Sequence, residues 1–128
     1  MHNPPMFARR GVFLVVAAAL AAIGCGGTAD DRPAKWSFIS ATIVEPSCAT
    51  VNCHSQVAAR AGVDLHDRAT GWHDLTTRLF VNPTTPEQSE ILFLMRAQGA
   101  TRMPPDVPLP EADIVLIENW IKGGAFNN

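Results

Sequence analysis

Two of the three cysteines in this chain lie close together and are followed at once by a histidine, in the stretch CATVNCH at positions 48–54. Four residues separate Cys48 from Cys53, and His54 is the next residue. Two thiols this close in sequence either form a small disulfide ring or bind a common group. Either outcome ties down a loop in a chain of 128 residues, a length that predicts one domain.

The N-terminal segment resembles a bacterial export signal. An arginine pair precedes an apolar run at 11–23, which is shorter than the roughly 20 residues that span a membrane. Such a run is typical of a cleaved signal peptide. Cys25 follows in AAIGCGG, which resembles a lipobox except that Ala22 stands where leucine is preferred. We expect residues 1–24 to be a lipoprotein signal peptide and Cys25 to be the lipidated residue; a twin-arginine signal and a retained membrane anchor are the alternatives.

Cleavage before Cys25 would remove two arginines and no acidic residue, so the formal net charge of −2 would become about −4. This charge argues against nucleic acid as a partner, since nucleic-acid binding needs a basic face. Exported proteins lie in an oxidising compartment, where Cys48 and Cys53 either pair with each other or are both used by a bound group. A domain this short gains stability from such a covalent or ligand staple.

We expect an all-α domain over residues 36–126, preceded by a flexible tether at 25–35. No stretch alternates between apolar and polar residues well enough to predict a strand. The first helix should begin near Trp36, with Ser37 as its N-cap, and end at Pro46 just before the cysteines. Four residues are predicted to form its apolar face: Phe38, Ile39, Thr42 and Ile43.

A second helix is indicated over residues 85–99. Thr85 is its predicted N-cap, Pro86 its first residue and Gln88 the capping-box partner, and Gly99 closes it. The pattern from 55 to 78 is irregular and predicts only a short helix near 55–60 and turns after it.

The last helix should begin at Pro110 and end at Gly123, with acidic residues in its first turn and Lys122 in its last. Its apolar residues are Ile114, Leu116, Ile117, Trp120 and Ile121. The preceding stretch, ATRMPPDVPLP, contains four prolines and should be an extended, stiff loop. Long loops in a small helical domain indicate disorder or function, and a flat apolar cofactor would give them a surface on which to pack.

Covalent haem attachment uses two thiols, which add to the porphyrin vinyl groups, and an imidazole that binds the iron. The histidine must follow the second cysteine, as His54 follows Cys53. Two residues more than the usual two-residue gap enlarge the loop without moving His54. A disulfide between the cysteines remains open as an alternative. A zinc site completed by His66 or His73 is disfavoured, because only Cys48, Cys53 and His54 cluster in sequence and a structural site needs four ligands.

An iron bound by His54 needs a second axial ligand, and Met/His ligation is typical of electron-transfer haems. Met103 lies in RMPP, in the proline-rich loop, where a core role would not explain it. We predict Met103 as this ligand, with His66 and His73 as fallback ligands. Arg102 could pair with a haem propionate. The helix crossing expected beside the haem consists of Trp36, Phe38, Ile114, Ile117 and Trp120.

The chain resembles the class I c-type cytochromes, and most closely the planctomycete-type cytochrome-c-like domains of exported bacterial proteins. The matching segments are CATVNCH, AGVDL, VNPTTPEQSEILFLM, RMPP and LPEADIVLIENWIKGGA, in the family's order over roughly 40–125. The resemblance implies a small helical fold with long loops around one covalent haem c. It also implies thioethers from Cys48 and Cys53, His54 as the proximal iron ligand and Met103 as the distal one. The four-residue gap departs from the family's pattern.

These observations predict a lipid-anchored monohaem cytochrome c that transfers single electrons to redox partner proteins in the bacterial cell envelope. We expect it at the outer membrane, facing the periplasm and held by its N-terminal lipid. With both axial positions filled by protein, it would be an electron carrier and not an enzyme. Two alternatives remain: a haem-free lipoprotein that uses the fold as an interaction module with a Cys48–Cys53 disulfide, and a small haem enzyme with Met103 unbound.

Overall fold

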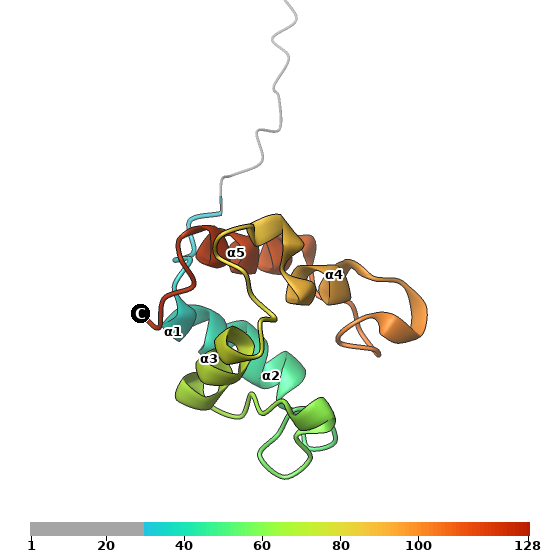
Figure 1. Ribbon diagram of the computed structural model, residues 1–128. Coiled ribbons are helices and arrows are strands. Elements are labelled where there is room, and N and C mark those ends of the chain that lie inside the picture. The colour runs from blue at the N-terminus through green and yellow to red at the C-terminus, as the bar shows by residue number, and fades with distance from the viewer. Residues whose placement is uncertain (1–29) are drawn as a thin grey trace, which may run out of the picture.

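The computed structural model describes residues 30–128. The predicted signal peptide at 1–24, Cys25 and the first part of the tether lie outside these residues. Over the described residues the chain is all-α, as the sequence predicted, with short helices and no strand (Figure 1). None of the helices within this range is long and apolar enough to cross a membrane.

The first helical run is continuous but changes type twice. Its consecutive parts are α1 (Trp36–Ile39), the π-helical segment η1 (Ser40–Val44) and α2 (Glu45–Cys48). The predicted end at Pro46 is therefore wrong. Pro46 lies in the first turn of α2, where its fixed φ and missing N–H are tolerated. The π-helical turn allows this, because the bond from Glu45 N–H to the Ser40 carbonyl oxygen lets α2 begin in a new register.

The N-cap predicted for this run is also wrong. Lys35 occupies the cap position and its side chain makes no capping hydrogen bond. Asn128 supplies the missing acceptors instead, because its carbonyl oxygen accepts from Ser37 N–H (2.8 Å) and its Oδ1 accepts from Trp36 N–H (3.0 Å). The end of the chain thus caps its first helix.

Of the four residues predicted for the buried face of the run, only Thr42 is exposed, whereas Trp36, Ser40 and Val44 are buried without having been predicted for this face. Ile39 and Ile43 are buried and Phe38 packs at the edge of the core. Thr42 is exposed, and its hydroxyl donates to the Phe38 carbonyl oxygen (2.8 Å). The π-helical turn contains one additional residue, so Ile43 and Val44, rather than Thr42 and Ile43, face the core.

A helix that the sequence did not predict, α3 (Arg68–Thr77), lies within the segment expected to be irregular. It begins at Asp67, whose carboxylate accepts two main-chain N–H bonds of the first turn (2.8 and 3.0 Å). Its apolar periodicity is weak, because Gly71 and Leu75 are its buried residues. A Cβ at Gly71 would lie 3.3 Å from Trp36 Cζ2, so glycine allows α3 to pack closely against α1.

The short helix predicted near 55–60 is not formed. Turns occupy this segment and lead into a 3₁₀ turn, η2 (Arg60–Gly62). Ala59 and Ala61 have φ angles of 35° and 55°, which interrupt a right-handed helix.

The helix predicted over 85–99 is shorter and is divided. A 3₁₀ turn, η3 (Pro86–Gln88), precedes α4 (Glu90–Arg96), and Ser89 between them is extended (φ −64°, ψ 122°). The buried Ser89 hydroxyl accepts from Asn82 N–H (2.9 Å), which holds the interruption in place. Ala97 is also extended, so α4 ends before Gly99, which begins the 3₁₀ turn η4 (Gly99–Thr101).

The last helix, α5 (Glu111–Lys122), is confirmed, with Pro110 as N-cap and Gly123 as C-cap. The five apolar residues predicted for it are its buried residues. Trp120 of α5 stacks on Trp36 of α1, with ring centroids 4.8 Å apart and an angle of 28° between the ring planes. The first and last helices therefore meet at the centre of the core.

Three tryptophans fasten the helices of this core together. The indole N–H groups of Trp36, Trp72 and Trp120 each donate to a main-chain carbonyl oxygen, at 2.7, 2.8 and 2.9 Å. The acceptors lie at the first residue of α3 or in the segment after α5. Burial of an aromatic ring together with a satisfied N–H makes each of these contacts both apolar and directional.

Candidate functional site

The loop from Cys48 to His54 begins directly at the end of α2 and is closed by its own hydrogen bonds. Cys53 N–H donates to the Thr50 carbonyl oxygen (2.9 Å), and His54 N–H donates to the Cys48 carbonyl oxygen (3.0 Å). The second bond ties the histidine back to the end of the helix that carries the first cysteine. The structure therefore brings the two cysteines and His54 together in one closed loop, with both thiols free.

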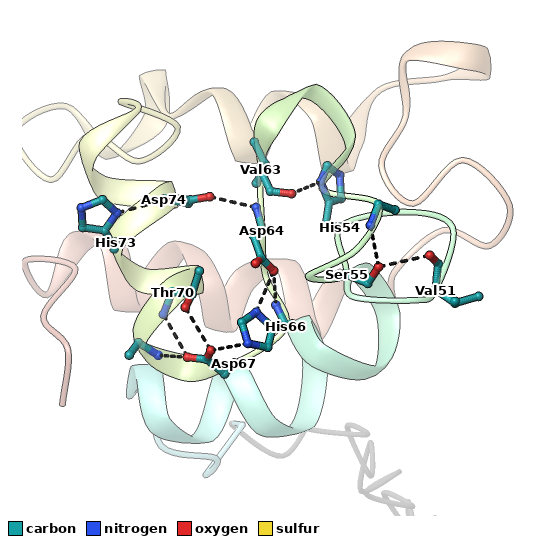
Figure 2. A network of polar contacts seen from close by, with 12 residues as sticks. Val51, His54, Ser55, Val63, Asp64, His66, Asp67, Thr70, His73 and Asp74 are labelled. Atoms are coloured by element: carbon teal, nitrogen blue, oxygen red, sulfur yellow. Dashed lines mark hydrogen bonds and ion pairs between the residues drawn. The ribbon is translucent and has the colours of Figure 1, made fainter.

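The His54 side chain is held by residues 63–65, which we call the His54 cradle (Figure 2). His54 Nδ1 lies 3.1 Å from the Val63 carbonyl oxygen, and Leu65 N–H donates to the His54 carbonyl oxygen (2.8 Å). A carbonyl oxygen only accepts, so Nδ1 must be the protonated nitrogen and the lone pair of a neutral ring lies on Nε2.

Nε2 of His54 is the nitrogen available to a ligand. Within residues 30–128 no hydrogen bond to Nε2 is formed. Every buried side-chain nitrogen in this range has a hydrogen-bond partner, so Nε2, which has none, is accessible to solvent. Histidines that bind metal ions donate their other ring N–H to a main-chain carbonyl or a carboxylate. His54 thus has the side-chain arrangement found in histidines that bind metal ions.

The Cys48 thiol is largely buried, unlike an ordinary surface thiol. Cys48 packs against the edge of the core. This burial, with a smaller contribution from the neighbouring Cys53, raises the pKa of the Cys48 thiol from 9.0 to about 11. Cys48 is therefore a neutral thiol at physiological pH.

An acidic network lies behind the His54 cradle. Asp64 N–H donates to Asp74 Oδ2 (2.8 Å), and the two ring nitrogens of His66 lie 2.8 Å from Asp64 Oδ1 and 2.7 Å from Asp67 Oδ2. Because both His66 nitrogens are engaged, His66 could bind iron only by breaking one of these contacts. His73, with a side chain 67% exposed, lies on the far side of the network from His54 (Figure 2). Neither fallback ligand is placed beside His54.

Met103 lies in the loop that joins η4 to α5 and is 39% exposed. Its N–H donates to the Leu94 carbonyl oxygen (3.0 Å), which fastens the loop to α4. The Arg102 guanidinium donates to carbonyl oxygens of the same loop, including those of Pro104 (3.2 Å) and Pro105 (3.1 Å). Arg102 thus organises the loop around Met103 through these main-chain contacts.

A cavity of about 300 Å³ lies between the Cys48–His54 loop and the Met103 loop. Ser47 and Thr50 line one side of it and Pro104 lines the other. None of Cys48, Cys53, His54 and Met103 lines this cavity. This volume is at the lower end of the range for ligand pockets. Within residues 30–128 no hydrogen bond joins the two loops.

Exposed apolar side chains lie on the same loops and on α4. They include Val57 in the turns after His54, which is 92% exposed, Phe93 on α4 and Val107 in the Met103 loop.

Two elements of the site were not predicted from the sequence: the Val63 carbonyl oxygen and the Asp74 carboxylate. A main-chain acceptor has no side-chain signature, so no sequence pattern could have indicated Val63. The N-cap at Asp67 could have been predicted from the sequence, because aspartate is favoured immediately before a helix. Within residues 30–128, no group of three or more His, Cys, Asp and Glu side chains is arranged to hold a metal ion.

Comparison with protein-family models, with curated proteins and with solved structures gave no match for this chain. The site is therefore interpreted from its own residues. Those residues are two thiols and one imidazole in a closed loop, and one partly exposed thioether in a separate loop.

Proposed function

We propose that this protein is a monohaem c-type cytochrome that carries single electrons. The observation that carries the proposal is the orientation of His54, whose Nδ1 is committed to the Val63 carbonyl oxygen and whose Nε2 is left accessible directly after Cys53. Histidine at this position and in this tautomer is the proximal ligand that covalent haem requires.

The donor set also fits haem c. Cys48 and Cys53 would hold it through thioether bonds, His54 would bind its iron and Met103 would supply the second axial sulfur. A haem bound in this way supplies one iron that exchanges a single electron between two oxidation states, with a potential raised by methionine ligation. The contribution of the chain is to hold the ring of His54 through the Val63 carbonyl oxygen and to keep the Met103 loop in place through the bond from Met103 N–H to the Leu94 carbonyl oxygen.

The cellular setting of the proposal rests on the sequence. A lipid on Cys25 would hold the protein at the membrane of the cell envelope, and stable anchoring would need more than one acyl chain. Its partners would be redox proteins that reach the haem edge, and both protein axial ligands argue for a carrier rather than an enzyme.

The first experiment is to express the full chain with haem-attachment machinery, wash the purified protein with acidic acetone and record its pyridine haemochrome spectrum and mass. We expect the α band typical of two thioether bonds and the added mass of one haem. Cys48→Ala and Cys53→Ala should each shift the band to the position typical of a single thioether. His66→Ala is the matched histidine control and should leave the spectrum of the bound haem unchanged.

The outcomes separate the proposal from its rival. A haem that is retained in the wild-type protein but lost in His54→Ala supports the proposal. A protein without haem, lighter by two protons than its reduced form, would show a Cys48–Cys53 disulfide. The haem-free interaction module would then be the correct function.

A further inference from the structure

We propose that Asp74 on α3 is a positioning residue for His54, acting through the main chain of the His54 cradle. The inference deepens the proposed function and rests on it, since it concerns how the proximal ligand is oriented. Asp74 does not touch the His54 ring. Its Oδ2 accepts the N–H of Asp64, the middle residue of the cradle, at 2.8 Å.

Two of the cradle's other main-chain contacts are with His54 itself, and a third runs from Val63 N–H to the Arg60 carbonyl oxygen (3.1 Å). Val63 and Leu65 on either side of Asp64 bond to the His54 ring and to the His54 carbonyl oxygen. The side chains of Val63 and Leu65 are buried, at 4% and 5% exposure, which fixes the cradle's position against the core. The N–H between them points to Asp74, so this carboxylate fixes the plane of the cradle (Figure 2).

Asp74 is well suited to hold this position. Leu75, the next residue of α3, is buried in the core, so the helix gives the carboxylate a rigid base. Oδ1 lies near His73 Nδ1 (3.4 Å) and Arg78 Nε (4.0 Å), which leaves Oδ2 for Asp64. The main-chain bond from Asp64 is the largest cause that lowers the pKa of Asp74, as expected for a charge-assisted hydrogen bond.

A second carboxylate, Asp67, provides the matched comparison. It also accepts main-chain N–H groups, from Ala69 and Thr70, and it also contacts the network through His66. Its main-chain acceptor role, however, caps α3 and does not involve the cradle. Loss of Asp67 should therefore remove the cap at the first turn of α3, seven residues before Asp74, without removing a hydrogen bond to the main chain of the cradle.

The test measures solvent exchange of the His54 Nδ1 proton by NMR in the purified full chain. If the protein carries haem, the measurement is made with the iron reduced. Asp74→Ala should accelerate this exchange roughly tenfold, as expected for the loss of one hydrogen bond to a charged group. Asp67→Ala should leave it within the error of the wild-type value. Asp74→Asn keeps an acceptor oxygen and should fall between Asp74→Ala and the wild type.

Equal exchange in Asp74→Ala and the wild type would overturn the inference, as would equal acceleration in Asp67→Ala and Asp74→Ala. If the alanine variant does not fold, Asp74→Asn is compared with Asp67→Asn, and faster exchange only in the former supports the inference. Failure of the proposed function has a different signature, because the wild-type protein would then lack covalent haem. His54 exchange is measured in that haem-free protein in the same way, and the same comparison decides.

Discussion

In the reduced, haem-free protein, Cys48 should react far more slowly with an alkylating reagent than the same residue in an unfolded chain. Burial raises the pKa of the Cys48 thiol from 9.0 to about 11. The thiolate is the nucleophile, so this change lowers the reactive fraction at pH 8 about a hundredfold. Restricted access to a sulfur packed against the core would slow the reaction further.

The assay uses a chain in which Cys25 and Cys53 are replaced by serine and alanine, so that Cys48 is the only thiol. Iodoacetamide labelling at pH 8 is followed by mass spectrometry, with and without urea. Replacing Cys53 removes its smaller contribution to the raised pKa of Cys48, so the native rate should be somewhat less than about a hundredfold below the unfolded rate. It should rise about tenfold for each pH unit until the thiol ionises. A native rate within about threefold of the unfolded rate would refute the argument from burial.

The same shift makes stability depend on pH. The pKa of Cys48 is higher in the folded than in the unfolded state, so its contribution is fully present below pH 9.0 and is lost as the pH rises to about 11. The loss should approach about 2 to 3 kcal/mol of unfolding free energy. Urea titrations of the single-thiol chain should show this loss, and the same chain with Cys48→Ala should not.

Two further predictions concern the axial ligand and an ion pair. Met103→Leu should lower the reduction potential of the haem protein, measured by potentiometry, and abolish the charge-transfer band of Met–iron ligation in the visible spectrum. Met95→Leu is the control, because it makes the same change at a buried position, and it should alter neither property. Hydrogen bonds from Lys122 and Arg96 lower the pKa of Glu118. The stability that these bonds contribute is therefore present above pH 4.5 and is lost as the pH falls through the lowered pKa. In urea titrations at a series of acidic pH values, the unfolding midpoint of Glu118→Gln should fall less with decreasing pH than that of the wild type.

The sequence predicted α5 well because its signals are local and agree with one another. Its proline start, acidic first turn, apolar stripe and glycine end all lie within Pro110 to Gly123. The first helix was predicted less well, because its N-terminal acceptors come from Asn128 and its register changes in a π-helical turn. Neither feature has a local sequence signature.

The middle of the chain was the least predictable. α3 has a weak apolar stripe and is fixed instead by the Asp67 cap, by the close approach at Gly71 and by a tryptophan bond to its first residue. Periodicity alone therefore underestimates a helix whose stability comes from tertiary contacts. The helix expected from Thr85 failed for a related reason, since Ser89 bonds to Asn82 and interrupts it.

The candidate site also contains some groups that the sequence identifies and others that only the structure shows. Side chains with distinctive chemistry, such as Cys48, Cys53 and His54, can be identified in the sequence, and their type and order predict a haem site. The groups that orient them are main-chain atoms, as at Val63, or a carboxylate ten residues from the N–H that it holds, as at Asp74. Their role depends on the path of the chain and could be found only from the structure.

The four-residue gap between the cysteines and the orientation of His54 depend on different contacts. The additional residues are taken up in the turn closed by Cys53 N–H and the Thr50 carbonyl oxygen, while His54 N–H returns to Cys48 at the end of α2. The His54 ring is oriented from elsewhere, by the Val63 carbonyl oxygen. A longer gap therefore changes how the first thiol approaches a bound group, and it leaves the nitrogen that would bind iron where the cradle holds it.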